Sequence, residues 1–275
     1  MRILGLNAAK EKLEIVSGAA EPQFRNFAGG FFRKNAFELI QEYCTKQFFM
    51  LKLIIFDWDD VITLGSTDGY FKCYHDTLVE LGVRLGPEEE HKRILAKWSM
   101  PHREELRELL KETPELLDSA CTIYEKKLFG DTFVNELRVA EGTTALLQKL
   151  HTTYALCVAT GMNPKLLKNV VMPKFIIPNV FSQIISTYDI ADTDKHKPHP
   201  HMVEEILKAH AVQPEQALFV GDAKTDVIMA QRAHVTPVVV LTGHLTKSDA
   251  EKLNVKFIIK NITDLPAVLS ELSGE

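Results

Sequence analysis

Two aspartates separated by one residue follow a short apolar run. Asp57 and Asp59 come directly after residues 51–56, which have the composition of a buried strand and end abruptly in acidic residues. In extended backbone their side chains point to the same side of the chain, whereas a turn would aim them differently. One carboxylate of such a pair can attack an electrophile while the other acts as acid and base. A solvated acidic turn is the plainer alternative.

Three further groups of residues could handle phosphate. Thr160 and Gly161 stand at a helix start, where a hydroxyl and backbone N–H groups can hold a phosphate oxygen or simply cap the helix. Lys197 precedes a proline, and its ammonium can neutralise phosphoryl charge, although such a lysine is more often solvated. Asp222 and Asp226 lie four residues apart after a glycine turn. Oxygen ligands of this kind suit Mg²⁺, which binds few protein carboxylates and keeps several waters.

Strands and helices alternate along most of the chain and would bring these residues to one edge of a sheet. We expect strands over residues 51–56, 154–159, 183–187, 217–220, 237–241 and 256–259, and helices over residues 164–171, 201–210, 225–233 and 265–272. Such alternation implies a parallel sheet covered by helices on both faces. Ligands bind at the carboxyl ends of strands in such a sheet, and the candidate residues follow predicted strands.

The four groups, in this order, resemble the motifs of the haloacid dehalogenase superfamily, from about residue 50 to the end of the chain. Asp57 matches the nucleophile and Asp59 the general acid and base. Thr160 matches the phosphate-binding residue, and Lys197 matches the conserved lysine. One departure is Asp60, which stands where a glycine is usual. The resemblance implies an α/β fold with a doubly wound parallel sheet and a small all-helical cap inserted after the first core strand.

The resemblance also implies Mg²⁺ as the cofactor. Asp222 and Asp226 match the metal-binding acids of the family, with Ala223 between them where a serine is common. Asp57 and the backbone carbonyl of Asp59 are expected to complete the metal shell. Relatives that dehalogenate organic acids lack an acid at the second aspartate, whereas phosphate-handling members use it for proton transfer. Hydrolysis of a phosphomonoester through an aspartyl-phosphate is therefore expected.

A helical insert should supply substrate specificity. Leucines recur at helical spacing among charged residues from about residue 70 to 150, which looks like the small helical cap of the family. Inside it, a segment containing Lys97, His102 and Arg103 interrupts two helical stretches with cationic and hydrogen-bonding groups. These three are candidate specificity residues. In the plainer alternative Lys97 and Arg103 are solvated.

Several activities of the superfamily fit the sequence. Residues 239–245 and the cap size are similar to phosphoglycolate-phosphatase-like proteins and other small phosphomonoester hydrolases. Residues 59–63 are similar to β-phosphoglucomutase, so a phosphomutase or a pyrophosphatase is an alternative. A non-catalytic regulatory protein of the same fold is a second alternative, and retention of the catalytic aspartates and lysine argues against it.

The net charge and the composition limit the kinds of partner that the protein is expected to bind. A formal net charge of −5 gives no bulk attraction to nucleic acid or to an anionic membrane, and no stretch of 18 apolar residues could span a bilayer. The four cysteines form no CxxC pair, which favours a reduced, cytoplasmic protein. We expect a small phosphorylated metabolite as the partner, and a monomer or a homodimer.

The sequence divides into three parts. Residues 50–66 and 150–275 should form the catalytic core, and residues 67–149 the helical cap. Residues 1–49 fall outside the resemblance, as an N-terminal extension of unknown role or a misassigned start.

Overall fold

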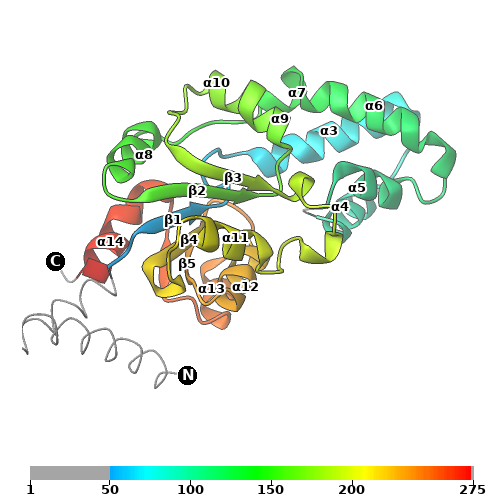
Figure 1. The fold of residues 1–275 in the computed structure, drawn as a ribbon. Coiled ribbons are helices and arrows are strands. Elements are labelled where there is room, and N and C mark those ends of the chain that lie inside the picture. Colours follow the sequence, from blue (N-terminus) through cyan, green and yellow to red (C-terminus); the bar gives the residue numbers. More distant parts are fainter. Residues whose placement is uncertain (1–49, 99, 274–275) are drawn as a thin grey trace, which may run out of the picture. The chain divides into compact units, whose positions relative to one another are not determined.

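A six-stranded parallel sheet forms the centre of the computed structural model, which describes residues 50–98 and 100–273. The strand order is β3-β2-β1-β4-β5-β6 (Figure 1). The strands are β1 (Leu53–Phe56), β2 (Ala155–Thr160), β3 (Phe181–Ser186), β4 (Ala217–Gly221), β5 (Thr236–Val240) and β6 (Phe257–Ile259). The six predicted strands are all present, within two residues of their expected bounds. The N-terminal extension expected over residues 1–49 lies outside the described residues.

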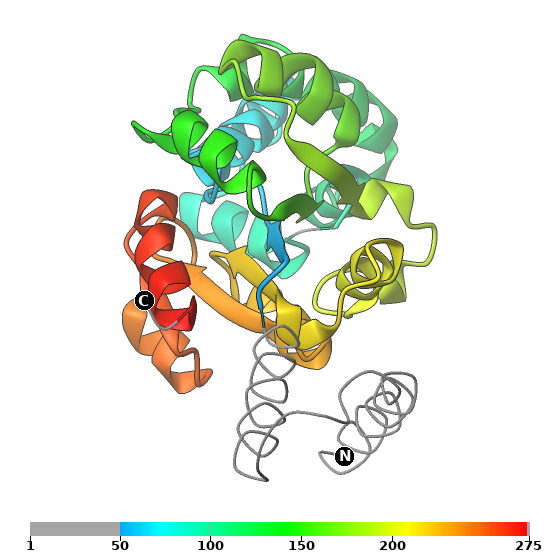
Figure 2. The same cartoon turned by 60° about the vertical axis from the view of Figure 1, so that its left-hand side comes forward.

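Helices cover both faces of the sheet, because β1 is apolar on both sides. Leu53 and Ile55 face a cluster shared with α11 (His201–Ala209) and α12 (Lys224–Arg232). Ile54 and Phe56 belong to a second cluster, which includes apolar side chains of α8 (Thr143–His151) and α14 (Leu265–Ser273). The two helix layers are separated by the sheet in Figures 1 and 2. The predicted doubly wound α/β fold is confirmed.

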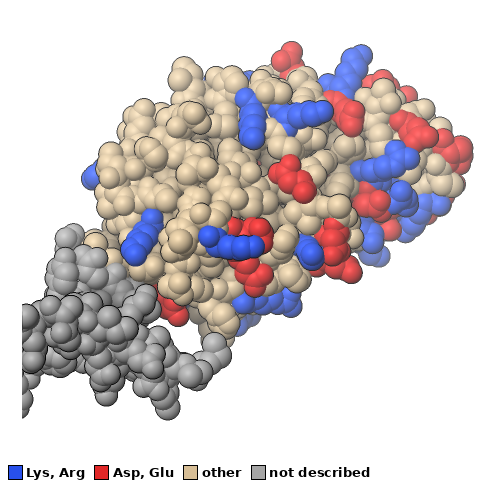
Figure 3. Space-filling model, in the orientation of Figure 1, with Lys and Arg blue, Asp and Glu red and all other residues tan. Residues whose placement is uncertain are grey.

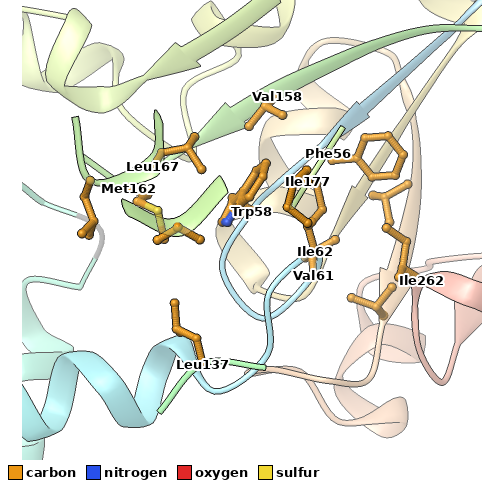
Figure 4. Packing of buried hydrophobic residues seen from close by; sticks show 14 of the residues in the cluster. Phe56, Trp58, Val61, Ile62, Leu137, Val158, Met162, Leu167, Ile177 and Ile262 are labelled. Atoms are coloured by element: carbon orange, nitrogen blue, oxygen red, sulfur yellow. The ribbon is translucent and has the colours of Figure 1, made fainter. Parts of the chain in front are cut away.

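Trp58 anchors the loop that follows β1. Its side chain is fully buried, and its ring centroid lies 5.8 Å from that of Phe181. Figure 4 shows the ring inside a cluster that includes Phe56, Val61 and Met162. Truncating a buried aromatic side chain to alanine costs about 3–5 kcal/mol. The packing of Trp58 therefore fixes the backbone between Asp57 and Asp59.

A group of helices lies between β1 and β2 in the chain and forms the cap: α3 (Ser66–Glu80), α4 (Pro87–Ala96), α5 (His102–Leu109), η1 (Pro114–Leu116), α6 (Leu117–Leu128) and α7 (Asp131–Val134). The two segments that connect it to the sheet run antiparallel, because the backbone N–H groups of Leu64 and Arg138 each donate to the carbonyl of the other, at 2.8 and 2.9 Å. We place the cap between these two residues. The expected cap range of 67–149 also includes α8, which packs against β2 and η6 (Ile262–Asp264).

The remaining elements differ from the prediction in detail. The helix expected over residues 164–171 is divided into α9 (Pro164–Leu166), a π-helical turn η2 (Leu167–Val171) and α10 (Met172–Lys174). An unpredicted short helix, α13 (Lys247–Lys252), is capped at its N-terminus by Thr246, whose hydroxyl accepts the N–H of Asp249. Single turns complete the list: η3 (Thr187–Asp189), η4 (Thr193–Lys195) and η5 (Pro214–Gln216).

The described surface carries charges of both signs. Figure 3 shows basic and acidic side chains intermixed on one face, most densely at the end where the cap helices lie. No helix in the described part of the chain is both long and apolar enough to cross a bilayer.

Candidate active site

Three carboxylates converge at the carboxyl ends of β1 and β4. These strands are neighbours in the sheet, so the residues that follow them lie side by side. Asp57 follows β1, and Asp222 and Asp226 follow β4. One oxygen from each carboxylate lies within 4.8 Å of the others, and all three side chains are buried. The proximity arises from the pairing of two strands that are far apart in the chain, which presents their carboxyl ends at the same edge of the sheet.

Lys197 lies among these carboxylates. Its Nζ is 3.0 Å from Oδ1 of Asp57 and 2.8 Å from Oδ1 of Asp226, and its side chain is only 2% exposed. Burial alone would lower the pKa of Lys197, but attraction from Asp226 and Asp57 raises it above its usual value. The lysine therefore stays charged and can neutralise a phosphoryl group bound at this place.

The environments of the first two aspartates differ. Burial raises the pKa of Asp57 to about 6, although Lys197 opposes the rise. Burial and repulsion from Asp57 and Asp60 raise the pKa of Asp59 well above its usual value. Lys197 thus favours the ionised form of Asp57, whereas the surroundings of Asp59 favour its protonated form, a difference that suits a nucleophile beside a general acid. Both side chains line the same cavity.

Backbone N–H groups hold the carboxylates of Asp57, Asp222 and Asp226 in place. The N–H of Trp58 donates to Oδ1 of Asp57 at 2.7 Å. Oδ2 of Asp226 accepts the N–H of Ala223 at 3.1 Å. His244 donates its backbone N–H to Oδ2 of Asp222 at 3.0 Å. These bonds orient each carboxylate without using its whole set of lone pairs.

The carboxylate cluster fits a divalent cation. Burial, with repulsion from Asp226 and Asp57, raises the pKa of Asp222 well above its usual value. Three buried carboxylates face one ammonium, so the cluster carries more negative than positive charge when ionised. Hard oxygen donors with this excess charge are the ligands that Mg²⁺ prefers. Among the described residues no other group of three His, Cys, Asp or Glu side chains has its ligand atoms this close together.

Position 243, beside the carboxylate cluster, requires a glycine. From the sequence, the segment that contains Gly243 was noted only for its similarity to phosphoglycolate-phosphatase-like proteins. A Cβ atom added to Gly243 would lie 1.8 Å from Oδ2 of Asp222. The loop after β5 can therefore approach this carboxylate only with a glycine at this position. The next residue, His244, then donates its N–H to the same oxygen.

The predicted phosphate-binding pair lies on the neighbouring strand. Thr160 is the last residue of β2, is fully buried, and accepts the N–H of Met162 at 3.1 Å through its hydroxyl. Gly161 lines the same cavity as Asp57 and Lys197. The structure thus brings Gly161 next to the carboxylate cluster and places Thr160 at the end of the strand that supports it.

A cavity of about 60 Å³ lies between the sheet and the cap. Its core side is lined by Asp57, Asp59, Gly161 and Lys197. Its cap side is largely aromatic, with Tyr70, Trp98 and Tyr124 in the lining together with His102 and Glu105, and Tyr188 of the core completes the lining. Trp98 lies within the predicted specificity segment. The three tyrosines and Glu105 were not predicted, and Glu105 lies in a strongly charged helix whose sequence indicates exposure to solvent.

The three candidate specificity residues are placed differently. His102 lines the cavity, where its Nδ1 lies 3.1 Å from the hydroxyl of Tyr188. Arg103 is 49% exposed and pairs with Asp118 at 2.6 Å, and Lys97 is exposed. Neither Lys97 nor Arg103 lines the cavity, so contact with a ligand would require this segment to move. Ser99, within the same predicted segment, lies outside the described residues.

Asp60 has a structural role that the family pattern does not indicate. Its φ of +54° is in the left-handed region, which explains why a glycine is usual here. Its carboxylate accepts the N–H groups of Gly65 at 2.7 Å and Thr67 at 3.0 Å, at the start of α3. The hydroxyl of Thr242 donates to its carbonyl oxygen. Asp60 thus connects the loop after β1 to the first cap helix and to the loop after β5.

Comparison with known proteins identifies the same region. Residues 54–240 match the model of the haloacid dehalogenase-like hydrolase family. The chain is 32% identical over 95 residues to a pyrophosphatase PpaX from Oceanobacillus iheyensis, an alignment that covers 34% of this chain and 43% of that protein. The match thus spans less than half the length of such curated relatives.

Solved structures share the fold. A predicted phosphoglycolate phosphatase from Haemophilus somnus superposes with a TM-score of 0.67 at 19% identity, over 79% of this chain and 97% of that one. A haloacid dehalogenase-like hydrolase from Streptococcus pneumoniae gives a TM-score of 0.63 at 20% identity, over 79% and 98%.

Proposed function

This chain belongs to the haloacid dehalogenase-like hydrolase family, and we propose that it is a Mg²⁺-dependent phosphatase of a small phosphomonoester. The observation that carries the proposal is the convergence of Asp57, Lys197, Asp222 and Asp226 on one buried point beside Asp59. The names of the curated pyrophosphatase relatives support phosphate as the group that is transferred. A regulatory protein without activity would have no need for this full set.

The first step is attack on phosphorus by a carboxylate oxygen of Asp57. The new bond joins this oxygen to phosphorus, and the bond between phosphorus and the ester oxygen breaks. In the proposed reaction Asp59 enters this step protonated and gives its proton to the departing oxygen, a role that its raised pKa favours. The alcohol leaves, and Asp57 carries the phosphoryl group as an aspartyl-phosphate.

In the second step Asp59 acts as a base. It takes a proton from a water molecule, whose oxygen attacks the phosphorus and displaces the carboxylate of Asp57. Inorganic phosphate is released, and Asp59 is protonated again. Proton transfer by one side chain thus serves both halves of the reaction, which explains why Asp59 must be near Asp57, in surroundings that raise its pKa.

Lys197 and the backbone at Gly161 position the phosphoryl group. The ammonium of Lys197 already touches the attacking carboxylate, so it can reach the oxygens of a bound phosphate. Asp57, Asp222, Asp226 and the backbone carbonyl of Asp59 would hold Mg²⁺. When bound, this ion supplies positive charge that stabilises the phosphoryl oxygens.

Phosphate release from p-nitrophenyl phosphate tests the proposal. We expect release with Mg²⁺, loss of release with excess EDTA, and restoration by added Mg²⁺. Asp57→Asn should abolish release, whereas Glu108→Gln, a change on a half-buried surface position of α5, should not. Equal release by the native protein and by Asp57→Asn would rule the proposal out.

A further inference from the structure

The hydroxyl of Tyr70 reaches the candidate general acid. Tyr70 belongs to α3, the first cap helix, and lines the cavity together with Asp57 and Asp59. Its hydroxyl donates to Oδ2 of Asp59 at 3.4 Å, which is long for a hydrogen bond. Hydrogen bonds at catalytic groups are often long before a substrate binds and shorten in the complex. The cap therefore contacts the proton-transferring carboxyl directly.

Aromatic packing fixes the ring of Tyr70. Its centroid lies 4.6 Å from that of Phe133, in α7, and 5.9 Å from that of Trp98, in the segment before α5. A Cβ atom added to Gly69 would lie 2.8 Å from Cδ2 of Phe133, so the glycine lets α3 approach α7 closely at this point. These contacts hold the ring in place and determine where its hydroxyl lies.

Helix α3 is also tied to the loop that carries Asp59. The next residue, Asp60, accepts the backbone N–H groups of Ser66 at 3.1 Å and Thr67 at 3.0 Å. Thr67 stands three residues before Tyr70, within one turn of the same helix. The separation of Tyr70 and Asp59 is therefore set by hydrogen bonds between the loop and the start of the helix, as well as by the docking of the cap helices.

The two oxygens of the Asp59 carboxyl have different surroundings. Oδ2 accepts from Tyr70, whereas Oδ1 is buried and has no hydrogen-bond partner among the described residues. A buried polar atom without a partner costs free energy, and such atoms often belong to catalytic groups. Oδ1 is thus the oxygen that is free to exchange a proton with a bound ester.

We propose that Tyr70 is a positioning residue, which holds Asp59 for proton donation to the leaving group. This inference rests on the proposed phosphatase function. In the first step the proton moves from Oδ1 of Asp59 to the ester oxygen, while the bond from that oxygen to phosphorus breaks and Asp57 bonds to phosphorus. Negative charge develops on the Asp59 carboxyl, and a hydroxyl donor stabilises this charge more than it stabilises the neutral acid. Tyr70 itself neither gains nor loses a proton.

The dependence of the rate on the leaving group tests this role. Phenyl phosphate and p-nitrophenyl phosphate have similar shapes, but phenolate is the poorer leaving group and needs the proton more. Tyr70→Phe removes only the hydroxyl and keeps the ring. We expect kcat/KM with Mg²⁺ to fall about tenfold for phenyl phosphate and less than about threefold for p-nitrophenyl phosphate. Equal losses for the two esters would overturn the inference.

Tyr188→Phe is the matched control. It removes a hydroxyl from the lining of the same cavity, but this hydroxyl lies 3.1 Å from Nδ1 of His102. We expect the variant to change kcat/KM by the same factor for both esters, because a change in the lining alone does not depend on how much the leaving group needs a proton. A selective loss for phenyl phosphate as large as that of Tyr70→Phe would refute a specific role of Tyr70.

A double-mutant cycle separates action through Asp59 from a structural role. Asp59→Asn lacks the proton donor, so Tyr70 has no proton transfer to assist in this variant. Adding Tyr70→Phe to it should change the rate of phosphoenzyme formation from phenyl phosphate by less than about twofold, whereas losses that multiply would contradict the inference.

Failure of the proposed function would look different. The native protein would then hydrolyse neither ester, and the positioning role would be refuted together with the function. Hydrolysis of both esters by the native protein, with losses that multiply in the double variant, would preserve the phosphatase function and refute only the role of Tyr70.

Discussion

Nζ of Lys197 lies 3.0 Å from Oδ1 of Asp57, the carboxylate that attacks phosphorus in the proposed reaction. The lysine thereby keeps its partner ionised, because its positive charge opposes the effect of burial on the pKa of Asp57. The same contact holds the carboxylate in one orientation. Lys197 thus has two tasks, to preserve the nucleophile and to receive the phosphoryl charge.

Replacement of this lysine tests both tasks. Lys197→Met should lower kcat by about 10²–10³-fold, the loss typical of a missing group that stabilises transition-state charge. Lys195→Met is the control, since that side chain is exposed and pairs only with Asp192 in the described structure. Steady-state kinetics on p-nitrophenyl phosphate would measure the effect. A loss below about threefold, which is far less than such a group contributes, would exclude Lys197 from the chemistry.

The capping role of Asp60 predicts a loss of stability. Asp60→Gly permits the positive φ but removes the carboxylate from the start of α3, so unfolding free energy should fall by about 0.5–2 kcal/mol. Asp60→Asn keeps an acceptor oxygen and should lose less. Urea unfolding of the three proteins would measure the difference. A glycine variant as stable as the native protein would show that relief of backbone strain offsets the lost cap.

The placement of the candidate catalytic residues at one edge of the sheet could be predicted, because it follows from the position of each residue relative to a strand. Asp57, Asp222 and Thr160 end or follow apolar runs, and parallel strands present such positions at one edge of the sheet. Lys197 is different, since it stands on a loop and no strand pattern marks it. Lys197 was identified by its position in the order of the motifs, and its contact with Asp57 in the structure explains why a lysine stands there.

The cap lining could not be predicted, because it depends on how helices dock. Glu104 and Glu105 are adjacent and chemically identical, yet only Glu105 is buried in the cavity. Arg103 was a candidate as a cation in a segment that interrupts two helical stretches, but its partner Asp118 is fifteen residues away on another helix. Tertiary packing determines which of these side chains are buried in the cavity, and the spacing of residues in the sequence does not predict that packing.

Steady-state kinetics can decide whether Lys97 and Arg103 bind the substrate or are solvated. The contact with Asp118 predicts that Arg103→Ala will leave kcat/KM within about twofold of the native value, because changes outside a site remove no transition-state contact. His102→Ala should raise KM, since the imidazole lines the cavity. The sequence-based hypothesis that Arg103 and Lys97 bind the substrate predicts a raised KM for their alanine variants as well, which a single kinetic series would reveal.

The dependence of stability on pH should reveal the carboxylate cluster. In the metal-free protein the pKa of Asp57 is raised from 3.8 to about 6, so the native state binds more protons than the unfolded state between these values. Its stabilising contribution is therefore complete below the lower value and is lost as pH rises through about 6. Asp222, with a pKa raised in the same direction, adds to this trend.

Mg²⁺ should reverse the trend, because it binds ionised carboxylates. We expect the increase in melting temperature caused by Mg²⁺ to be larger at about pH 7.5 than at about pH 5. Thermal unfolding with and without Mg²⁺ would measure this difference, with Asp222→Asn as the variant that loses it. An increase that is the same at both pH values would contradict a metal site formed by these carboxylates.

The central claim is that Asp57 becomes phosphorylated, and acid quenching followed by mass spectrometry tests it most directly. Asp59→Asn should slow water activation by about 10²–10⁴-fold while an ester with a good leaving group still reacts, so phosphoenzyme should accumulate. We predict added phosphate on Asp57 in this variant and none in Asp57→Asn, which should be inactive at any Mg²⁺ concentration. Turnover by Asp57→Asn with no phosphate on any carboxylate would contradict the account.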